Sequence, residues 1–204
     1  FSDLKYRAIE IGMLIDATLL ALALAAQVRL IQQERIFAEQ RATRDPLTDL
    51  YNRRSFLEMA QPIWSTAQRN ARDVSLIMLD IDHFKSINDR FGHAMGDAAL
   101  VAITKALAKV VREGDIVARW GGEEFLILLP ETSLESAAAL AERLQNAISE
   151  IRLPSGSKEI TFTASFGVAH KNKHENLENV ISEADNFLYQ SKNTGRNKIT
   201  SALG

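Results

Sequence analysis

Residues 119–130 read RWGGEEFLILLP and place two glycines and two acidic residues directly before an apolar run. The run Phe125–Leu129 has the length and composition of a buried strand, and Ile116–Trp120 has strand character too. Together they predict a β-hairpin that turns at Gly121 and Gly122. Since glycine tolerates positive φ and has no side chain, we expect a tight turn whose backbone another molecule can approach closely.

Outside this hairpin, strand and helix patterns alternate from Asp45 onward. We expect strands at 74–82, 116–120, 125–129 and 161–169, and helices at 53–71, 94–111, 133–151 and 177–191. This order predicts an α+β fold of ferredoxin-like type, in which a mainly antiparallel central sheet is flanked by helices.

The N-terminal segment differs from the rest of the chain. Residues 8–31 are strongly apolar and long enough to cross a bilayer as a helix, although Glu10 and Asp16 interrupt them. A carboxylate in a span costs roughly 2.5 to 3.5 kcal/mol, so two interpretations stay open: a span packed among other helices, or a dimerisation helix.

Coiled-coil spacing continues this segment towards the domain. Six positions are spaced alternately four and three residues apart, and all but Arg35 are apolar. They are Leu24, Val28, Ile31, Arg35, Ala38 and Ala42. We therefore expect a membrane or stalk helix over 1–42 and a catalytic domain over 43–204. The first residue is Phe1, so we also expect the chain to be a fragment of a longer protein.

Composition narrows the range of functions. The 204 residues allow one domain of about 150 residues with an appendage. With 25% charged residues and a net charge of −2, the chain is not expected to bind a nucleic-acid polymer. It contains no cysteine, so oxygen or imidazole groups must hold any metal.

Two aspartates end the apolar run VSLIMLDID at 74–82. Strand alternation puts Asp80 and Asp82 on one face, with Ile81 pointing into the core. Acids at the end of an apolar strand suit a hard cation, although an isolated pair is more often exposed to water. The hairpin turn adds Glu123 and Glu124, which can approach Asp80 and form a pocket for Mg²⁺ and phosphate.

Cations and amide side chains elsewhere match a nucleotide. Lys85 lies at the start of an expected helix, and Lys192 and Arg196 flank a glycine turn, so the three together match a polyphosphate. Asp97 can accept from the two adjacent donors of guanine, and Asn88 can pair at the same edge. Helix caps for these two and a plain loop position for His93 are the alternatives.

These motifs make the chain resemble the GGDEF domain, the diguanylate cyclase family, from about Thr43 to the C-terminus. The motifs are DPLTDLYNRR at 45–54, DIDHFKSINDRFGHAMGD at 80–97, RWGGEEF at 119–125 and KNTGRN at 192–197. The resemblance implies a fold similar to the nucleotidyl cyclase and polymerase palm. It also implies that two GTP molecules condense to cyclic di-GMP and two pyrophosphates.

The resemblance assigns roles residue by residue. It implies two Mg²⁺ ions per site, with Mn²⁺ as a substitute, held by Asp80, the carbonyl of Ile81, Glu123 and Glu124. Catalysis falls to Glu123, as proton acceptor for the 3′-hydroxyl, and to Lys85. Substrate-binding positions are Phe84, Asn88, His93, Asp97, Lys192 and Arg196. The turn reads GGEEF instead of GGDEF, which retains a carboxylate, and His83 replaces an aromatic residue of many relatives.

A further pattern resembles the family's inhibitory site. Arg112 and Asp115 form an RxxD motif shortly before Arg119, and Arg143 is a candidate for a second part of that site. Arginine can pair with phosphate or guanine and stack on a base, so we expect feedback inhibition by cyclic di-GMP. A salt bridge at a helix end is the alternative.

The expected assembly follows from the family's reaction, and the expected location follows from a second resemblance. Each domain offers one nucleotide half-site, so we expect a homodimer. Residues 8–31 resemble the last helix of 7TMR-DISM receptors, which favours the bacterial inner membrane with the catalytic domain in the cytoplasm. Two other functions stay open: an inactive module that binds cyclic di-GMP, and a cyclase that makes an adenine-containing product.

Overall fold

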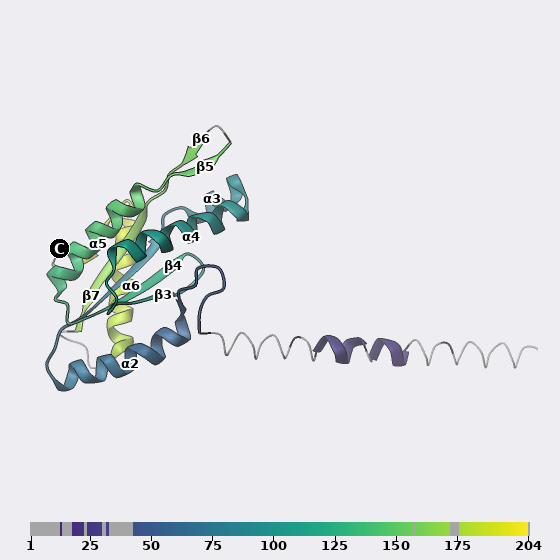
Figure 1. Cartoon of the computed structure of the whole chain (residues 1–204), viewed down its shortest axis with the longest axis horizontal. Helices are drawn as coiled ribbons and strands as arrows, with labels where there is room; N and C mark the ends of the chain where they lie inside the picture. Colours follow the sequence, from purple (N-terminus) through teal and green to yellow (C-terminus); the bar gives the residue numbers. More distant parts are fainter. Residues whose placement is uncertain are drawn as a thin grey trace, which may run out of the picture. The chain divides into compact units, whose positions relative to one another are not determined.

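The computed structural model describes residues 13, 18–22, 24–29, 32, 43–156, 158–171 and 176–203. By its contacts the chain divides into two compact units, Phe1–Ala42 and Thr43–Gly204, both drawn in Figure 1. The described residues of the first unit are helical and exposed, Leu24 and Val28 among them. Among the described residues, no helix has the length and apolar character needed to cross a membrane. Ile31, Arg35, Ala38 and Ala42 of the expected seam lie outside the described residues.

The second unit is a mixed α+β domain. Its helices are α2 (Arg53–Arg69), α3 (Phe84–Phe91), α4 (His93–Val110), α5 (Leu134–Ser149) and α6 (Leu177–Asn193). Its strands are β1 (Tyr51–Asn52), β2 (Val74–Ile81), β3 (Ile116–Arg119), β4 (Glu124–Pro130), β5 (Leu153–Ser155), β6 (Lys158–Ile160), β7 (Ala164–His170) and β8 (Ile199–Ser201).

A six-stranded sheet in the order β1-β3-β4-β2-β7-β8 forms the centre of this domain. The three inner pairings, β3 with β4, β4 with β2 and β2 with β7, are antiparallel, whereas the short strands β1 and β8 join the edges in parallel. The expected α+β fold with a mainly antiparallel sheet is therefore confirmed, and the parallel edges make the sheet mixed.

Helices cover both faces of the sheet, so the domain has two cores. Ile77 and Leu79 of β2 pack with α3, α4 and α5, whereas Leu76 and Met78 pack with α2 and α6. Figure 1 shows these two helix layers on either side of the strands. All of β2 is buried, because alternate side chains of the strand point to opposite faces of the sheet and each set packs into one core.

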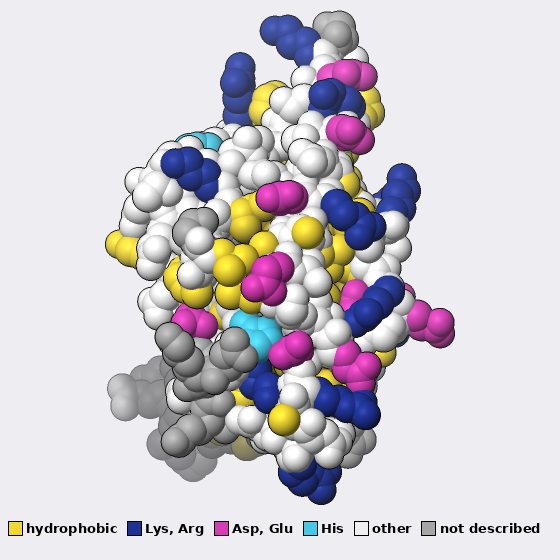
Figure 2. Space-filling view, turned by 90° about the vertical axis from the view of Figure 1, so that its left-hand side faces the viewer, with side chains coloured by type: hydrophobic (Ala, Val, Ile, Leu, Met, Phe, Trp, Pro, Cys, Tyr) yellow, Lys and Arg dark blue, Asp and Glu magenta, His cyan; other side chains and the backbone are white. Residues whose placement is uncertain are grey.

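The surface of the domain mixes both signs of charge. On the side shown in Figure 2, acidic and basic side chains lie interspersed, with hydrophobic atoms between them. A mixture of this kind suits the small net charge of the chain, because neighbouring opposite charges offset each other's field.

Short elements escaped the sequence patterns. The two-residue and three-residue strands β1, β5, β6 and β8 were not expected, because so few residues show no period. The strand expected at 161–169 begins at Ala164 instead. Between β2 and α4, the chain forms the separate helix α3, which is followed by Gly92, where φ is 83°.

The chain enters the domain through a turn held by Asp45. The Asp45 carboxylate accepts from the backbone N–H and hydroxyl of Thr48, at 2.9 and 2.7 Å, and pairs with Arg119 of β3 at 3.0 Å. Burial raises the pKa of Asp45, but these hydrogen bonds and the Arg119 charge outweigh it and leave the pKa below its ordinary value. The entry turn is thereby tied to the strand that leads into the glycine turn.

Candidate active site

Three elements meet at the end of β2. Asp80 lies opposite Glu124 in the β2–β4 register, and the backbone N–H of Ile81 donates to the carbonyl of Glu123 at 3.4 Å. From α6, Lys192 Nζ lies 2.7 Å from Asp80 Oδ2. The structure therefore brings the strand-end acid, the glycine turn and one predicted phosphate-binding lysine to one place.

Electrostatics at this place favour the binding of a cation. Burial is the main cause that raises the pKa of Asp80 to about 6, and repulsion from Glu123 and Glu124 adds to it while Lys192 opposes it. Burial likewise raises the pKa of Glu123, with Lys192 opposing and Glu124 adding. Carboxylates that repel one another in a half-buried site become more stable when a divalent cation joins them.

The donor set fits a hard metal ion, although the acids do not already surround one. Within the part of the chain that the structure describes, no three acidic or histidine side chains are arranged closely enough to enclose an ion. The Lys192 ammonium instead lies on Asp80. Oxygen donors from Asp80, Glu123 and Glu124 remain the chemistry that Mg²⁺ prefers, so the predicted ligands stay a prediction.

The glycine turn does not use the positive φ that glycine tolerates. Neither Gly121 nor Gly122 lies in the left-handed region. The turn uses glycine for space: a Cβ at Gly121 would lie 2.6 Å from Glu124 Oε2, whereas a Cβ at Gly122 would meet nothing within 4 Å. Gly121 thus makes room for the Glu124 carboxylate, and Gly122 leaves the backbone open to another molecule.

Asp82 does not share the setting of Asp80. Only 4% exposed, it accepts from the hydroxyls of Thr163 and Ser165, at 2.6 Å each, and from the backbone N–H of Asn197 at 2.9 Å. These donors occupy the carboxylate, so the expectation that Asp80 and Asp82 act as a cation-binding pair is not supported. Of the two aspartates, Asp80 is the one that lies opposite Glu124 at the glycine turn.

The helix α3 carries three of the predicted residues, Phe84, Lys85 and Asn88. Lys85 is exposed in its first turn, where an α-helix has backbone N–H groups without acceptors inside the helix. The Phe84 side chain is buried in the core, so only its backbone can take part in substrate binding. His83, directly before the helix, has φ of 58°, a left-handed value that no sequence pattern indicated.

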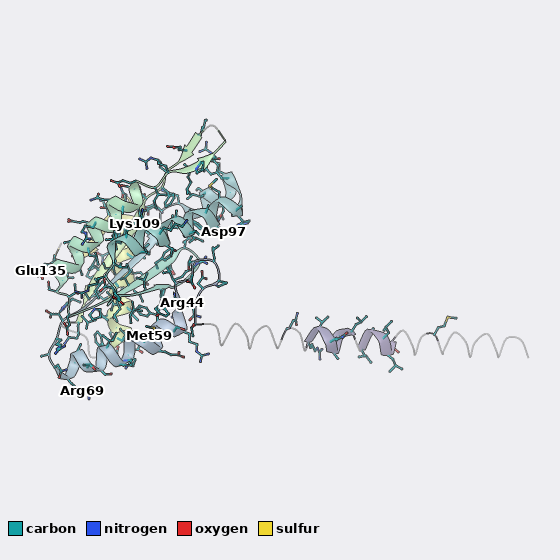
Figure 3. All side chains as sticks on the ribbon, in the orientation of Figure 1. Arg44, Met59, Arg69, Asp97, Lys109 and Glu135 are labelled. Atoms are coloured by element: carbon teal, nitrogen blue, oxygen red, sulfur yellow. The ribbon has the colours of Figure 1, made fainter. Side chains whose placement is uncertain are left out.

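Gly96 allows α3 and α4 to approach each other closely. It lies in the motif at 80–97, but the sequence pattern indicated no function for it. A Cβ at Gly96 would lie 2.0 Å from Asn88 Oδ1 and 3.1 Å from Phe84 Cζ. The Asn88 side chain therefore lies against α4, one residue from Asp97. Asp97 is exposed near the start of α4, at the opposite end from Lys109 (Figure 3). His93, also exposed, is the first residue of α4.

Neither Asn88 nor Asp97 acts as a side-chain cap of these helices. The residue that precedes α4 is Gly92, and α3 begins after His83 without a side-chain cap. The capping alternative is therefore wrong, which leaves both polar side chains available between α3 and α4.

The predicted inhibitory residues gather away from the glycine turn. Arg112, Asp115 and Arg143 line one cavity of about 190 Å³. Within it, Arg112 Nε pairs with Asp115 Oδ1 at 3.0 Å, and Arg112 also donates to the carbonyl of Pro130 and the hydroxyl of Thr132. The salt bridge that was the alternative interpretation is therefore present.

A sheet of this topology, with acids at the end of a central strand and on an adjoining glycine turn, suits the binding of a nucleoside triphosphate through divalent cations. Residues 42–198 match the family model described as diguanylate cyclase, GGDEF domain. The chain belongs to this family.

Relatives and solved structures agree with the family. Diguanylate cyclase DgcM of Escherichia coli K12 is 41% identical over 80% of this chain and 39% of that protein. Diguanylate cyclase VdcA of Vibrio cholerae is 40% identical over 90% of this chain and 52% of that protein. The chain thus spans about half or less of the length of these curated relatives.

Two solved structures are informative. The coiled coil and GGDEF domain of DgcB from Caulobacter crescentus, in complex with c-di-GMP, matches with a TM-score of 0.75 and 31% identity over 90% of this chain and 99% of that one. The active GGEEF domain of a diguanylate cyclase from Vibrio cholerae matches with a TM-score of 0.69 and 32% identity over 74% of this chain and 96% of that one.

Proposed function

We propose that this chain is a diguanylate cyclase, a nucleotidyltransferase that condenses two GTP molecules into cyclic di-GMP and releases two pyrophosphates. The observation that carries the proposal is the convergence of Asp80, Glu124 and Lys192 beside the glycine turn that bears Glu123. Family membership supports it, as does the active GGEEF domain among the structural neighbours, because residues 121–125 here read GGEEF as well.

The chain's own residues would divide the work. Glu123 accepts the proton of the attacking 3′-hydroxyl, while Lys85, Lys192 and Arg196 hold the triphosphate. Asn88, His93 and Asp97 bind guanosine.

The metal site is part of the same proposal. Mg²⁺, or Mn²⁺ in its place, would be held by Asp80, the carbonyl of Ile81, Glu123 and Glu124. When bound, two such ions supply Lewis-acid polarisation and offset the charge of the departing pyrophosphate.

Product analysis tests the activity directly. The full chain is incubated with GTP and Mg²⁺ after bound product has been stripped, and the products are identified by mass spectrometry. We expect cyclic di-GMP and pyrophosphate in a ratio of one to two. If the folded chain makes no cyclic di-GMP yet binds it, the alternative of a receptor module replaces this proposal.

Base choice is tested at Asp97. A carboxylate accepts from both donors that guanine offers and adenine lacks, so Asp97→Ser should weaken GTP binding and admit ATP better. An unchanged preference for GTP would remove Asp97 from base recognition. An adenine-containing product from the unaltered chain would favour the second alternative.

We also propose product inhibition at the cavity of Arg112, Asp115 and Arg143. The shared cavity supports it, since two guanidinium groups and one carboxylate match the phosphates and guanines of cyclic di-GMP. Arg112→Ala should make the rate insensitive to added cyclic di-GMP while the initial rate stays unchanged. Equal inhibition of both proteins would show that the Arg112–Asp115 pair is only structural.

Dimerisation and membrane location are proposals that rest on sequence. We propose a homodimer aligned by the segment before Asp45, and attachment of the full-length protein to the bacterial inner membrane with this domain in the cytoplasm. Leu24 and Val28 are exposed one turn apart on a helix, which supports the packing of a second helix against them. Sedimentation of the chain and fractionation of cells are the respective tests.

A further inference from the structure

The loop that carries Arg196 has an unusual backbone. Between α6 and β8, three successive residues have positive φ: Gly195 at 118°, Arg196 at 61° and Asn197 at 47°. Two of them are not glycine, and residues other than glycine rarely adopt positive φ because their Cβ crowds the backbone. Such a conformation persists only where surrounding contacts hold it.

Contacts from two distant parts of the chain hold this loop at Asn197. On one side, Asp82 Oδ2 accepts the backbone N–H of Asn197 at 2.9 Å. On the other, Gln145 Nε2 of α5 donates to the backbone carbonyl of Asn197 at 2.8 Å and to its Oδ1 at 3.1 Å. Both backbone polar groups of Asn197 are therefore bound by side chains, and these side chains come from different elements.

Asp82 itself is fixed. Its carboxylate also accepts from Thr163 and Ser165, at the start of β7, so it joins the end of β2 to β7 and to the loop. It stands two residues after Asp80 on the same strand end. One buried carboxylate thus links the strand end that carries Asp80 to the loop of Arg196.

We propose that Asp82 and Gln145 are positioning residues that hold Asn197 and thereby fix where the Arg196 side chain leaves the loop. The inference rests on the proposed function, in which Arg196 binds the triphosphate of GTP. Neither residue touches the reacting atoms. Their effect is on the binding of substrate, since a loop that samples other conformations presents its cation to phosphate for only part of the time.

Gln145 allows the cleaner test because it is half-buried and belongs to neither hydrophobic core, so its loss leaves the core intact. Its role requires a donor. Gln145→Ala removes the donor, Gln145→Glu replaces it with a carboxylate that faces the Asn197 carbonyl, and Gln145→Lys restores a donor of similar reach. We expect KM for GTP to rise about three- to tenfold in the first two variants, as for the loss of hydrogen bonds, with kcat within about twofold.

The lysine variant should recover most of the affinity. The neighbouring Asn146→Ala, exposed on the same helix, is the matched control and should leave KM unchanged.

A double-mutant cycle shows whether the effect passes through Arg196. In an Arg196→Ala background, Gln145→Ala should raise KM no further, because the side chain that the loop positions is gone. Asp82→Asn should raise KM more than Gln145→Ala does, and it should also lower the melting temperature, because Asp82 is buried with three donors. Amide exchange of residues 194–198 should quicken in both single variants.

The outcomes separate the two proposals. If the unaltered chain makes no cyclic di-GMP, the proposed function fails, and the exchange measurement still reports whether Asp82 and Gln145 hold the loop. If the unaltered chain is active but Gln145→Ala leaves KM for GTP unchanged, the positioning role is overturned. Additive effects of Gln145→Ala and Arg196→Ala would also overturn it.

Discussion

Glu123 is the residue on which the proposed chemistry most depends. Its backbone carbonyl is tied to Ile81, and its carboxyl pKa is raised by burial. A proton acceptor and metal ligand cannot be replaced by an amide, which neither accepts a proton nor carries charge. We expect Glu123→Gln to lower the initial rate of cyclic di-GMP formation by at least about 10²-fold.

The melting temperature should not fall in this variant, and Glu142→Gln, exposed on α5, is the control that should retain full rate. A Glu123→Gln protein that keeps a tenth or more of the rate would contradict the assignment.

Gly96 leads to a second prediction at this scale. Because a Cβ there would lie 2.0 Å from Asn88 Oδ1, Gly96→Ala must displace the Asn88 side chain from α4. We expect KM for GTP to rise about tenfold or more, as for the loss of a base-pairing side chain. Steady-state kinetics measure it, with the exposed Ala98→Ser on the same helix as control. An unchanged KM would mean that Asn88 does not contact the base.

At the scale of single residues, the sequence identified the chemical groups better than their conformations. The types and spacing of Asp80, Glu123 and Lys192 indicated a metal and phosphate site, and the structure brings them together. Gly121 and Gly122 do not use the positive φ that glycine tolerates, because a turn can use glycine for space alone. The use of Asp82 was not foreseen, since its three donors lie far away in the sequence.

At the scale of elements, the close packing of α6 on β7 depends on Gly167. A Cβ at Gly167 would lie 2.0 Å from the carbonyl of Ala184 and 2.3 Å from the N–H of Leu188. Backbone atoms cannot move aside as a flexible side chain can. We therefore expect Gly167→Ala to lower the free energy of unfolding by at least about 2 to 3 kcal/mol.

Urea unfolding measures this loss. Gly114→Ala is the control, because an added Cβ at Gly114 meets nothing within 4 Å. Equal stability of the two variants would show that α6 can shift without cost.

The entry turn gives a pH prediction. The folded-state pKa of Asp45 lies below its ordinary value of 3.8, so the ionised carboxylate stabilises the fold above the unfolded-state value. That stability is lost as the pH falls through the lower, folded-state pKa. The stability gap between the unaltered chain and Asp45→Asn should therefore be constant above about pH 5 and should shrink below pH 4.

Urea unfolding across this pH range checks the gap, with the exposed Asp89→Asn as control. A gap that does not change down to pH 2 would show that the Asp45–Arg119 pair contributes nothing through its charge.

Long elements were predictable and short ones were not. The helices α2, α4, α5 and α6 and the inner strands each bury one face or both, so their apolar residues recur with a visible period. The edge strands β1 and β8 owe their conformation to a neighbouring strand and not to their own residues. A two-residue strand carries no such period at all.

At the scale of the whole molecule, the ring of cyclic di-GMP sets a requirement for two domains. In the proposed function, one domain offers one nucleotide half-site, and two phosphodiester bonds must form. We expect the specific activity of the chain to fall as it is diluted through the dissociation constant of its dimer. Rate measurements over a thousandfold range of protein concentration check this, with sedimentation at the same concentrations. A specific activity that stays constant while the chain is monomeric would contradict the homodimer.

The sequence by itself determined the fold class and the chemical groups of the site, because the periodic burial of side chains and the spacing of acids, cations and glycines are local properties. Only the tertiary structure decided which of the two aspartates faces the glycine turn and which is held by three donors, what the glycines make room for, and which side chains hold the loop of Arg196. The physical reason is that hydrogen bonds and close contacts depend on distances in space, and residues 52 to 115 positions apart meet only once the sheet and helices have packed.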